Sequence, residues 1–329
     1  MRYLLAALLC LSSCSSLGQA PGDPDTLASW NDCDSKRTLV RFVEAVTDED
    51  SPHFVPEPER IAVFDNDGTL WGEQPLYFQL VFALDRIRET ADAHPEWKEQ
   101  EPFKSVLAQD MKGVMASGKP GLFRILTESH AGTSVEEFQR HVAEWVEASA
   151  HPTTGRKYTE MVYQPMLEVL DYLRANGFKT YIVSGGGIDF MRVFAEEVYG
   201  IPPEQVIGSQ LATSYAMVDG KPVIQREPEM YHVDDEAGKP VSIQRFIGRK
   251  PLLAFGNSDG DYEMLEYTTV GNDRPSLGFF VHHTDDVREV AYDRDSHIGR
   301  LAEGLDDAEK RGWVLIDMKS DWLRLYPAR

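Results

Sequence analysis

The chain has 329 residues, of which 42% are hydrophobic and 10% aromatic, enough to bury a full core in one large domain or two modest ones. Its formal net charge of −21 argues against binding nucleic acid or an anionic membrane through a general basic surface. An anionic substrate therefore needs a local positive charge. The three cysteines, Cys10, Cys14 and Cys33, are too few for a disulfide framework.

The first residues are typical of an export signal. Arg2 precedes the apolar run YLLAALLCL, which is too short to span a bilayer stably, so residues 1–13 are expected to be removed. The following LSSC resembles the lipobox of bacterial lipoproteins, whose cysteine, here Cys14, is lipidated. A signal peptide cut near Ala20 is the alternative. The lipobox predicts an exported protein, anchored to a bacterial membrane and facing the periplasm or cell exterior, with residues 14–30 as a tether.

Beyond a helix expected over residues 36–46, three short apolar runs stand out: IAVF before Asp65, TYIV before Ser184 and LLAF before Gly256. Small or polar residues and then a helical pattern follow each run. Such runs without alternation favour central parallel strands, and their succession with helices predicts an α/β fold with a doubly wound parallel sheet. Ligands bind beyond the carboxyl ends of such strands, so the site is expected there.

The segment between the first and second runs shows helical patterns and no convincing strand. A capping box, Ser134 to Glu137, opens one of these helices. A helical insertion at this point predicts a cap over residues 76–159 that closes over the strand ends and excludes water. The α/β core then comprises residues 31–75 and 160–329.

Two further segments are expected to extend the core. The Asp219-Gly220 turn, between apolar flanks, predicts a β-hairpin after the second run. The tail from Ser276 to Arg329 is expected to add sheet and helix without chemistry of its own. His282 and His283 fit satisfied or surface histidines better than ligands.

Acidic and amide side chains gather at the expected strand ends. Asp65 and Asp67 follow the first run, and Asn257, Asp259 and Asp261 follow the third. Such a cluster is costly without a cation, and a hard divalent ion such as Mg²⁺ fits its oxygen ligands.

An anion site is expected beside this cluster. The SGGG segment exposes the Ser184 hydroxyl and backbone N–H groups near a helix N-terminus, which suits phosphate. Lys239 supplies the compact positive charge that the acidic chain otherwise lacks. Lys250 is the alternative, but it directly precedes the third run, at the end away from the site.

These motifs closely resemble those of the haloacid dehalogenase superfamily, and within it the phosphoserine-phosphatase-like branch. The matching residues are DNDGT at 65–69, VSGG at 183–186, Lys239, and GNSDGD at 256–261. The order of the motifs and the position of the helical cap match as well. The resemblance spans Arg60 to Gly278.

The resemblance implies a role for each matching residue. Asp65 is the nucleophile that forms an aspartyl-phosphate, and Asp67 is the general acid and later the base. The implied phosphate-binding residues are Ser184, Gly185, Lys239 and Thr69. The implied Mg²⁺ ligands are Asp65, the Asp67 backbone carbonyl, Asn257 and Asp261, with Asp259 as a further candidate.

Asn257 departs from the family pattern, which has aspartate at this position. An amide oxygen still coordinates a cation but gives it one less negative charge. Trp71, Glu73, Tyr77 and Phe78 either enter the pocket, where aromatics can hold a quaternary ammonium group, or pack the cap.

The sequence therefore predicts a Mg²⁺-dependent phosphomonoester hydrolase for a small phosphorylated metabolite. The alternative is a lipoprotein that keeps the fold and binds a ligand or partner without turnover.

Overall fold

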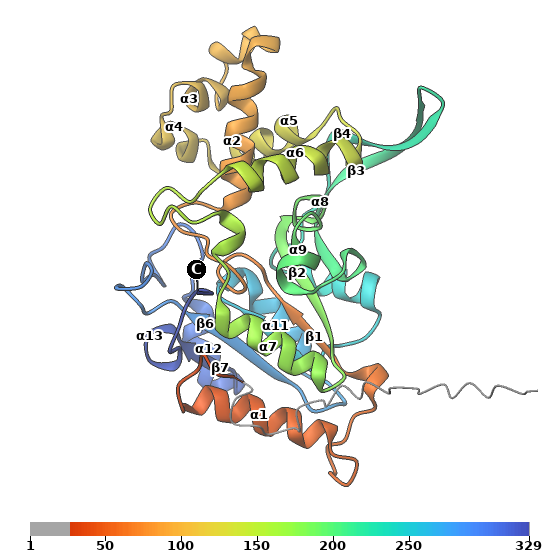
Figure 1. Ribbon diagram of the computed structural model, residues 1–329, viewed down its shortest axis with the longest axis vertical. Helices are drawn as coiled ribbons and strands as arrows, with labels where there is room; N and C mark the ends of the chain where they lie inside the picture. Colours follow the sequence, from red (N-terminus) through yellow and green to blue (C-terminus); the bar gives the residue numbers. More distant parts are fainter. Residues whose placement is uncertain (1–26, 329) are drawn as a thin grey trace, which may run out of the picture.

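The computed structural model describes residues 27–328, and within them the strands form one seven-stranded sheet (Figure 1). The sheet order is β4-β3-β2-β1-β5-β6-β7, and all neighbours are parallel except the β3–β4 hairpin. The strands are β1 (Ile61–Phe64), β2 (Lys179–Gly187), β3 (Val206–Val218), β4 (Lys221–His232), β5 (Leu253–Gly256), β6 (Leu277–His282) and β7 (Val314–Asp317). The α/β fold, the three expected strands and the hairpin are confirmed.

Helices cover both faces of the sheet, which explains why its central strands are continuous apolar runs. In β1, Ala62 and Phe64 belong to the apolar cluster that includes α1 (Asp34–Thr47) and α7 (Gln164–Ala175). Ile61 and Val63 belong to the cluster on the other face. The helices there are α10 (Gly238–Ser242), α11 (Tyr262–Thr269) and α12 (Glu303–Arg311).

The chain between β1 and α7 forms a separate group of helices beyond the carboxyl ends of the central strands, drawn in orange to yellow-green in Figure 1. They are α2 (Phe78–Thr90), α3 (Phe103–Leu107), α4 (Met111–Ala116), α5 (Gly118–His130) and α6 (Val135–Ala148). Leu84, Ile87 and Trp97 take part in an apolar cluster of their own. At the start of α6 the Glu137 N–H donates to Ser134 Oγ (3.1 Å), the expected N-cap.

Short helices make up the remaining connections. They are α8 (Ile188–Met191), α9 (Ala195–Tyr199), α13 (Met318–Asp321), the π-helical turn Ile243–Ile247, and single 3₁₀ turns at Glu57–Glu59, Ala91–Ala93, Pro95–Lys98, Tyr158–Glu160, Pro203–Gln205 and Asp259–Asp261.

The hairpin ties the cap helices to the core. It extends past the sheet and runs beside α5 and α6 (Figure 1). Arg226 on β4 accepts a backbone hydrogen bond from Gly132 (3.0 Å) and donates from Nε to the His130 carbonyl (3.0 Å). Its guanidinium also forms an ion pair with Asp189 of α8. The cap is therefore held by β4 as well as by its two connections to the core.

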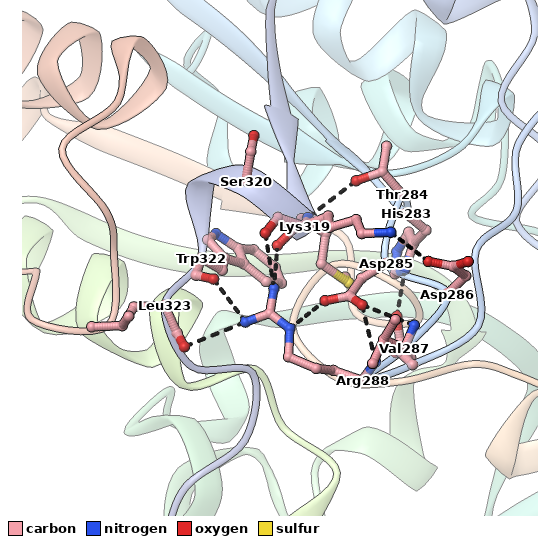
Figure 2. A network of polar contacts seen from close by, with 12 residues as sticks. His283, Thr284, Asp285, Asp286, Val287, Arg288, Lys319, Ser320, Trp322 and Leu323 are labelled. Atoms are coloured by element: carbon pink, nitrogen blue, oxygen red, sulfur yellow. Dashed lines mark hydrogen bonds and ion pairs between the residues drawn. The ribbon is translucent and has the colours of Figure 1, made fainter.

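The C-terminal segment is fastened by Arg288, which lies between β6 and α12 (Figure 2). Its guanidinium donates to the backbone carbonyls of Trp322 (2.8 Å) and Met318 (3.0 Å) and pairs with Asp285. These contacts hold α13 and the residues that follow it against the loop after β6.

The folded part of the chain begins earlier than expected. Leu27 and Trp30, at the end of the predicted tether, are buried, and the Trp30 ring lies 5.9 Å from that of Trp322. Apolar contact with the C-terminal segment is the physical reason. Residues 1–13 and Cys14 lie outside the described residues.

Within residues 27–328, none of the helices combines the length and apolar character needed to cross a bilayer.

Candidate active site

The loop after β1 carries both expected catalytic aspartates. The Asp65 N–H donates to the Phe255 carbonyl of β5 (2.9 Å), and the Asn66 carbonyl accepts from Leu70 N–H (2.8 Å), which closes a tight turn. Gly68 sits in this turn at φ +74°, a conformation that favours glycine. Asp65 and Asp67 both line one pocket at the carboxyl ends of the central strands.

Asp67 is held by an indole. Trp71 Nε1 donates to Asp67 Oδ1 (2.8 Å). Burial raises the pKa of Asp67 to about 6, and the Trp71 hydrogen bond opposes that rise by stabilising the charged form. An acid with this pKa is partly protonated near neutral pH, so it suits proton donation and later removal.

Lys239 is the positive charge beside Asp65. Its Nζ lies 2.8 Å from Asp65 Oδ1 and 2.5 Å from Asp261 Oδ1, and it donates to the Val183 carbonyl (3.1 Å). Burial alone would lower the pKa of Lys239, but the charges of Asp261 and Asp65 outweigh it and raise that pKa. Lys239 is therefore a fixed cation, as expected. Lys250 instead donates to carbonyls that follow α11, away from the site.

The end of β2 carries the residues that the sequence led us to expect at a phosphate site. Ser184, Gly185 and Gly186 line the pocket, and the Gly186 N–H donates to Ser184 Oγ (3.2 Å). Gln79 of α2 accepts from the Gly187 N–H (2.7 Å), so a cap side chain helps to shape this loop. The helix that follows, α8, has only four residues. It is therefore too short to provide the anion-binding helix N-terminus that the sequence suggested. Because the Gly186 and Gly187 N–H groups already donate within the loop, the Ser184 hydroxyl and Lys239 are the remaining candidates for contact with an anion.

The residues of the last motif point in different directions. Asp261 is fully buried; one oxygen meets Lys239 and the other accepts the N–H groups of Asn257 (3.0 Å) and Ser258 (3.1 Å). Asp259 faces away, because its Oδ1 accepts the backbone N–H groups of Ala302 (2.9 Å) and Gly304 (3.0 Å) at the start of α12. The structure thus gives Asp259 a capping contact in place of the metal contact considered for it.

Thr69 also differs from expectation. It is fully buried, does not line the pocket, and donates from Oγ1 to Asn257 Oδ1 (3.2 Å). Thr69 thus orients the Asn257 amide instead of facing a phosphate.

Glu73 is an acidic member of the site that the sequence identified only as a candidate pocket residue. It is 2% exposed and accepts from Asn257 Nδ2 (2.7 Å) and from the Tyr292 hydroxyl (2.6 Å). Gly68 and Gly299 leave room for it, since a Cβ on either would overlap its carboxylate. Burial raises the pKa of Glu73 well above its ordinary value. Nothing in the sequence indicated that Tyr292, from the C-terminal segment, completes this site.

The site gathers three buried acids, Asp65, Glu73 and Asp261, and the half-buried Asp67, and Lys239 is the one cation among them in the described residues. This excess of negative charge and the oxygen donors fit a hard divalent cation. No cluster of three or more His, Cys, Asp or Glu side chains placed to hold a metal occurs between residues 27 and 328. A set made of one carboxylate, a backbone carbonyl and an amide oxygen does not need such a cluster.

The cap closes the pocket, a cavity of about 510 Å³ lined by α2, α5 and the loops at the strand ends. Of the four aromatic and acidic candidates after β1, Glu73 and Tyr77 line it, while Trp71 and Phe78 are buried in the core. His283 is a satisfied histidine, as expected: one ring nitrogen lies 2.8 Å from the Gly68 carbonyl and the other 2.8 Å from Glu289.

Comparison with known proteins addresses the fold. A conserved protein of unknown function from Anaerococcus prevotii shares 15% identity at a TM-score of 0.50, over 76% of this chain and 85% of its own. A protein of unknown function from Bordetella pertussis shares 16% identity at a TM-score of 0.47, over 79% of this chain and 99% of its own. A phosphoserine phosphohydrolase-like protein from Francisella tularensis shares 15% identity at a TM-score of 0.36, over 76% of this chain and 98% of its own.

Among curated proteins there is no significant match. The family model for haloacid dehalogenase-like hydrolases matches residues 62–266, more than half of the chain, and this span contains Asp65, Ser184, Lys239 and the GNSDGD segment. The chain belongs to the haloacid dehalogenase-like hydrolase family.

Proposed function

We propose that this protein is a Mg²⁺-dependent phosphomonoesterase that acts on a small phosphorylated metabolite through an aspartyl-phosphate. The observation that carries the proposal is the placement of Asp65 beside a fixed lysine, with a second acid, Asp67, in the same buried pocket. The Ser184 hydroxyl and the Lys239 ammonium would supply the donors for phosphate oxygens, with Gly185 beside them in the pocket lining.

In the first step Lys239 and Ser184 hold the phosphoryl oxygens, and a carboxylate oxygen of Asp65 attacks phosphorus. The bond from Asp65 to phosphorus forms as the ester P–O bond breaks, and the leaving alkoxide takes the proton of Asp67. Asp67 is then a carboxylate.

In the second step Asp67 removes a proton from water, whose oxygen attacks phosphorus and displaces Asp65. The products are inorganic phosphate and the free nucleophile, with the proton returned to Asp67. Most of the catalytic demand in such a transfer is electrostatic and positional, and the rigid contacts of Lys239 and Trp71 meet that demand.

Asp65, the Asp67 backbone carbonyl and Asn257 would hold Mg²⁺. Asp261, also expected as a ligand, is left out of this set because one of its oxygens contacts Lys239 and the other accepts backbone N–H groups. The Glu73 carboxylate accepts a hydrogen bond from the Asn257 amide. When bound, the ion neutralises charge between Asp65 and the phosphoryl group.

Assay of a panel of phosphomonoesters with and without Mg²⁺, using wild type and Asp65→Asn, tests the proposal. We expect turnover that requires Mg²⁺ and is absent in Asp65→Asn at unchanged thermal stability. Turnover by the variant at the wild-type rate contradicts the mechanism.

We also propose that the protein is exported and anchored through a lipid on Cys14, on the strength of the LSSC segment. Cys14→Ala should then release it from the membrane fraction. An unmodified mature N-terminus downstream of Cys14 in the wild type contradicts the anchor.

A further inference from the structure

One face of α5 forms the far wall of the pocket. Lys119, Leu122, Phe123 and Leu126 follow the i, i+3, i+4, i+7 spacing of a single helix face, and all four line the pocket. Leu122 and Leu126 also pack against the apolar cluster of the cap. This wall is therefore apolar along most of its length and supported from behind.

Acidic residues line another part of the pocket. Asp235 and Glu236, between β4 and α10, both line the pocket. The Asp235 side chain lies beside Gly185 and Gly260, and it has no hydrogen-bond or ion-pair partner among the described residues. Its position next to Gly185 places a carboxylate beside the proposed phosphate site, where Lys239 and Lys119 act on it only from beyond ion-pair distance. A second anionic group on a substrate would meet repulsion there.

The two lysines that line the described pocket are both engaged. Lys239 contacts Asp65 and Asp261 at the closed end. Lys119 Nζ lies 3.4 Å from Glu236 at the pocket entrance. No arginine lines this pocket in the part of the chain that the structure describes. A carboxylate or second phosphate on the substrate would therefore have to compete with Glu236 for the exposed Lys119, since no unpaired cation lines the described pocket.

We propose that the substrate is a phosphomonoester of an apolar alcohol that carries no second negative charge, with a neutral or cationic far end. This inference rests on the proposed phosphomonoesterase function and specifies its substrate class. Leu122, Phe123 and Leu126 bury the apolar body, and Asp235 accepts a cationic group where one is present. O-phosphoserine, whose carboxylate needs a cation, is a poor substrate.

The test compares three aryl phosphates whose phenol leaving groups differ only in the para substituent: 4-ethylphenyl, 4-(2-aminoethyl)phenyl and 4-(2-carboxyethyl)phenyl phosphate. We expect kcat/KM for the neutral and cationic esters to exceed that for the anionic one by at least about tenfold, mainly through KM. Calorimetric titration of the Asp65→Asn variant with the same esters measures the binding preference without turnover.

Two variants test the walls. Glu236→Gln frees Lys119, so the ratio of kcat/KM for the anionic ester to that for the neutral ester should rise several-fold. Glu229→Gln, which removes the same charge at an exposed position of β4, should leave that ratio unchanged. Phe123→Gln should raise KM for the 4-ethylphenyl ester, and this ring is outside the apolar cluster of the cap, so the fold should tolerate the change.

Equal or preferential hydrolysis of the carboxyethyl ester, or of O-phosphoserine, overturns the substrate class and leaves the phosphomonoesterase function standing. Failure to hydrolyse or bind any ester in the presence of Mg²⁺ overturns the proposed function, and the substrate class with it.

Discussion

The contact between Asn257 and Glu73 allows a prediction with a magnitude. In Asn257→Asp a carboxylate oxygen replaces the amide nitrogen that lies 2.7 Å from Glu73 Oε1. Two charges at this distance repel by about 6 kcal/mol at an effective dielectric constant of 20. Protonation of an ordinary carboxyl at pH 7 costs about 4 kcal/mol, and protonation of Glu73 costs less because burial already raises its pKa, so about 4 kcal/mol sets the upper limit. The free energy of unfolding of the Mg²⁺-free variant should therefore be lower than that of wild type by up to about 4 kcal/mol.

The pH dependence and a second substitution sharpen this prediction. Repulsion raises the folded-state pKa of one carboxyl above its unfolded value, so the stability deficit should be small near pH 5 and grow toward pH 7. Asn257→Asp combined with Glu73→Gln exchanges the two groups and restores one donor facing one acceptor, so stability should recover to within about 1 kcal/mol of wild type. Urea denaturation without Mg²⁺ measures all three proteins. A single variant as stable as wild type at pH 7, or a double variant no better than the single, refutes the reasoning.

Three further predictions concern other contacts. Because Asp67 must be protonated to donate, kcat/KM for an alkyl ester should fall as pH rises through about 6. Trp71→Phe removes the hydrogen bond that stabilises the Asp67 carboxylate, so it should move this fall in kcat/KM to higher pH. A pH profile that the variant leaves unchanged contradicts the assignment of Asp67. Gly68→Ala should lower the free energy of unfolding by at least about 2 kcal/mol more than Gly220→Ala. Both glycines have positive φ, but only at Gly68 would the new Cβ meet neighbouring side chains. Equal losses in denaturant titration contradict this. Arg288→Lys should lower the free energy of unfolding by about 2 kcal/mol, because an ammonium cannot serve both the Trp322 and Met318 carbonyls in the same fork; an unchanged denaturation midpoint contradicts it.

The central strands were predictable because local sequence patterns determine them. IAVF, TYIV and LLAF are short, apolar on both faces and followed by small polar residues, and each became a central parallel strand. The meeting of Asp65, Ser184 and Lys239 follows from that topology, since parallel strands bring their carboxyl ends to one edge of the sheet.

The contacts that the sequence left open all join distant segments. Tyr292 reaches Glu73 from a loop more than two hundred residues away, and no periodicity or motif marks that loop. Asp259 sits in an acidic motif typical of metal sites, yet the N-terminus of α12 captures it. Thr69 is the fifth residue of a phosphatase motif but faces the interior. Side-chain direction and long-range pairing decide these cases, and neither is encoded in local spacing.

Acid quenching of the enzyme during turnover of a ³²P-labelled phosphomonoester, followed by peptide mapping, tests the central claim most directly. We expect Mg²⁺-dependent label on the peptide that contains Asp65, lost on treatment with hydroxylamine and absent in Asp65→Asn. Label at another residue, or full turnover with no labelled protein at any quench time, contradicts it.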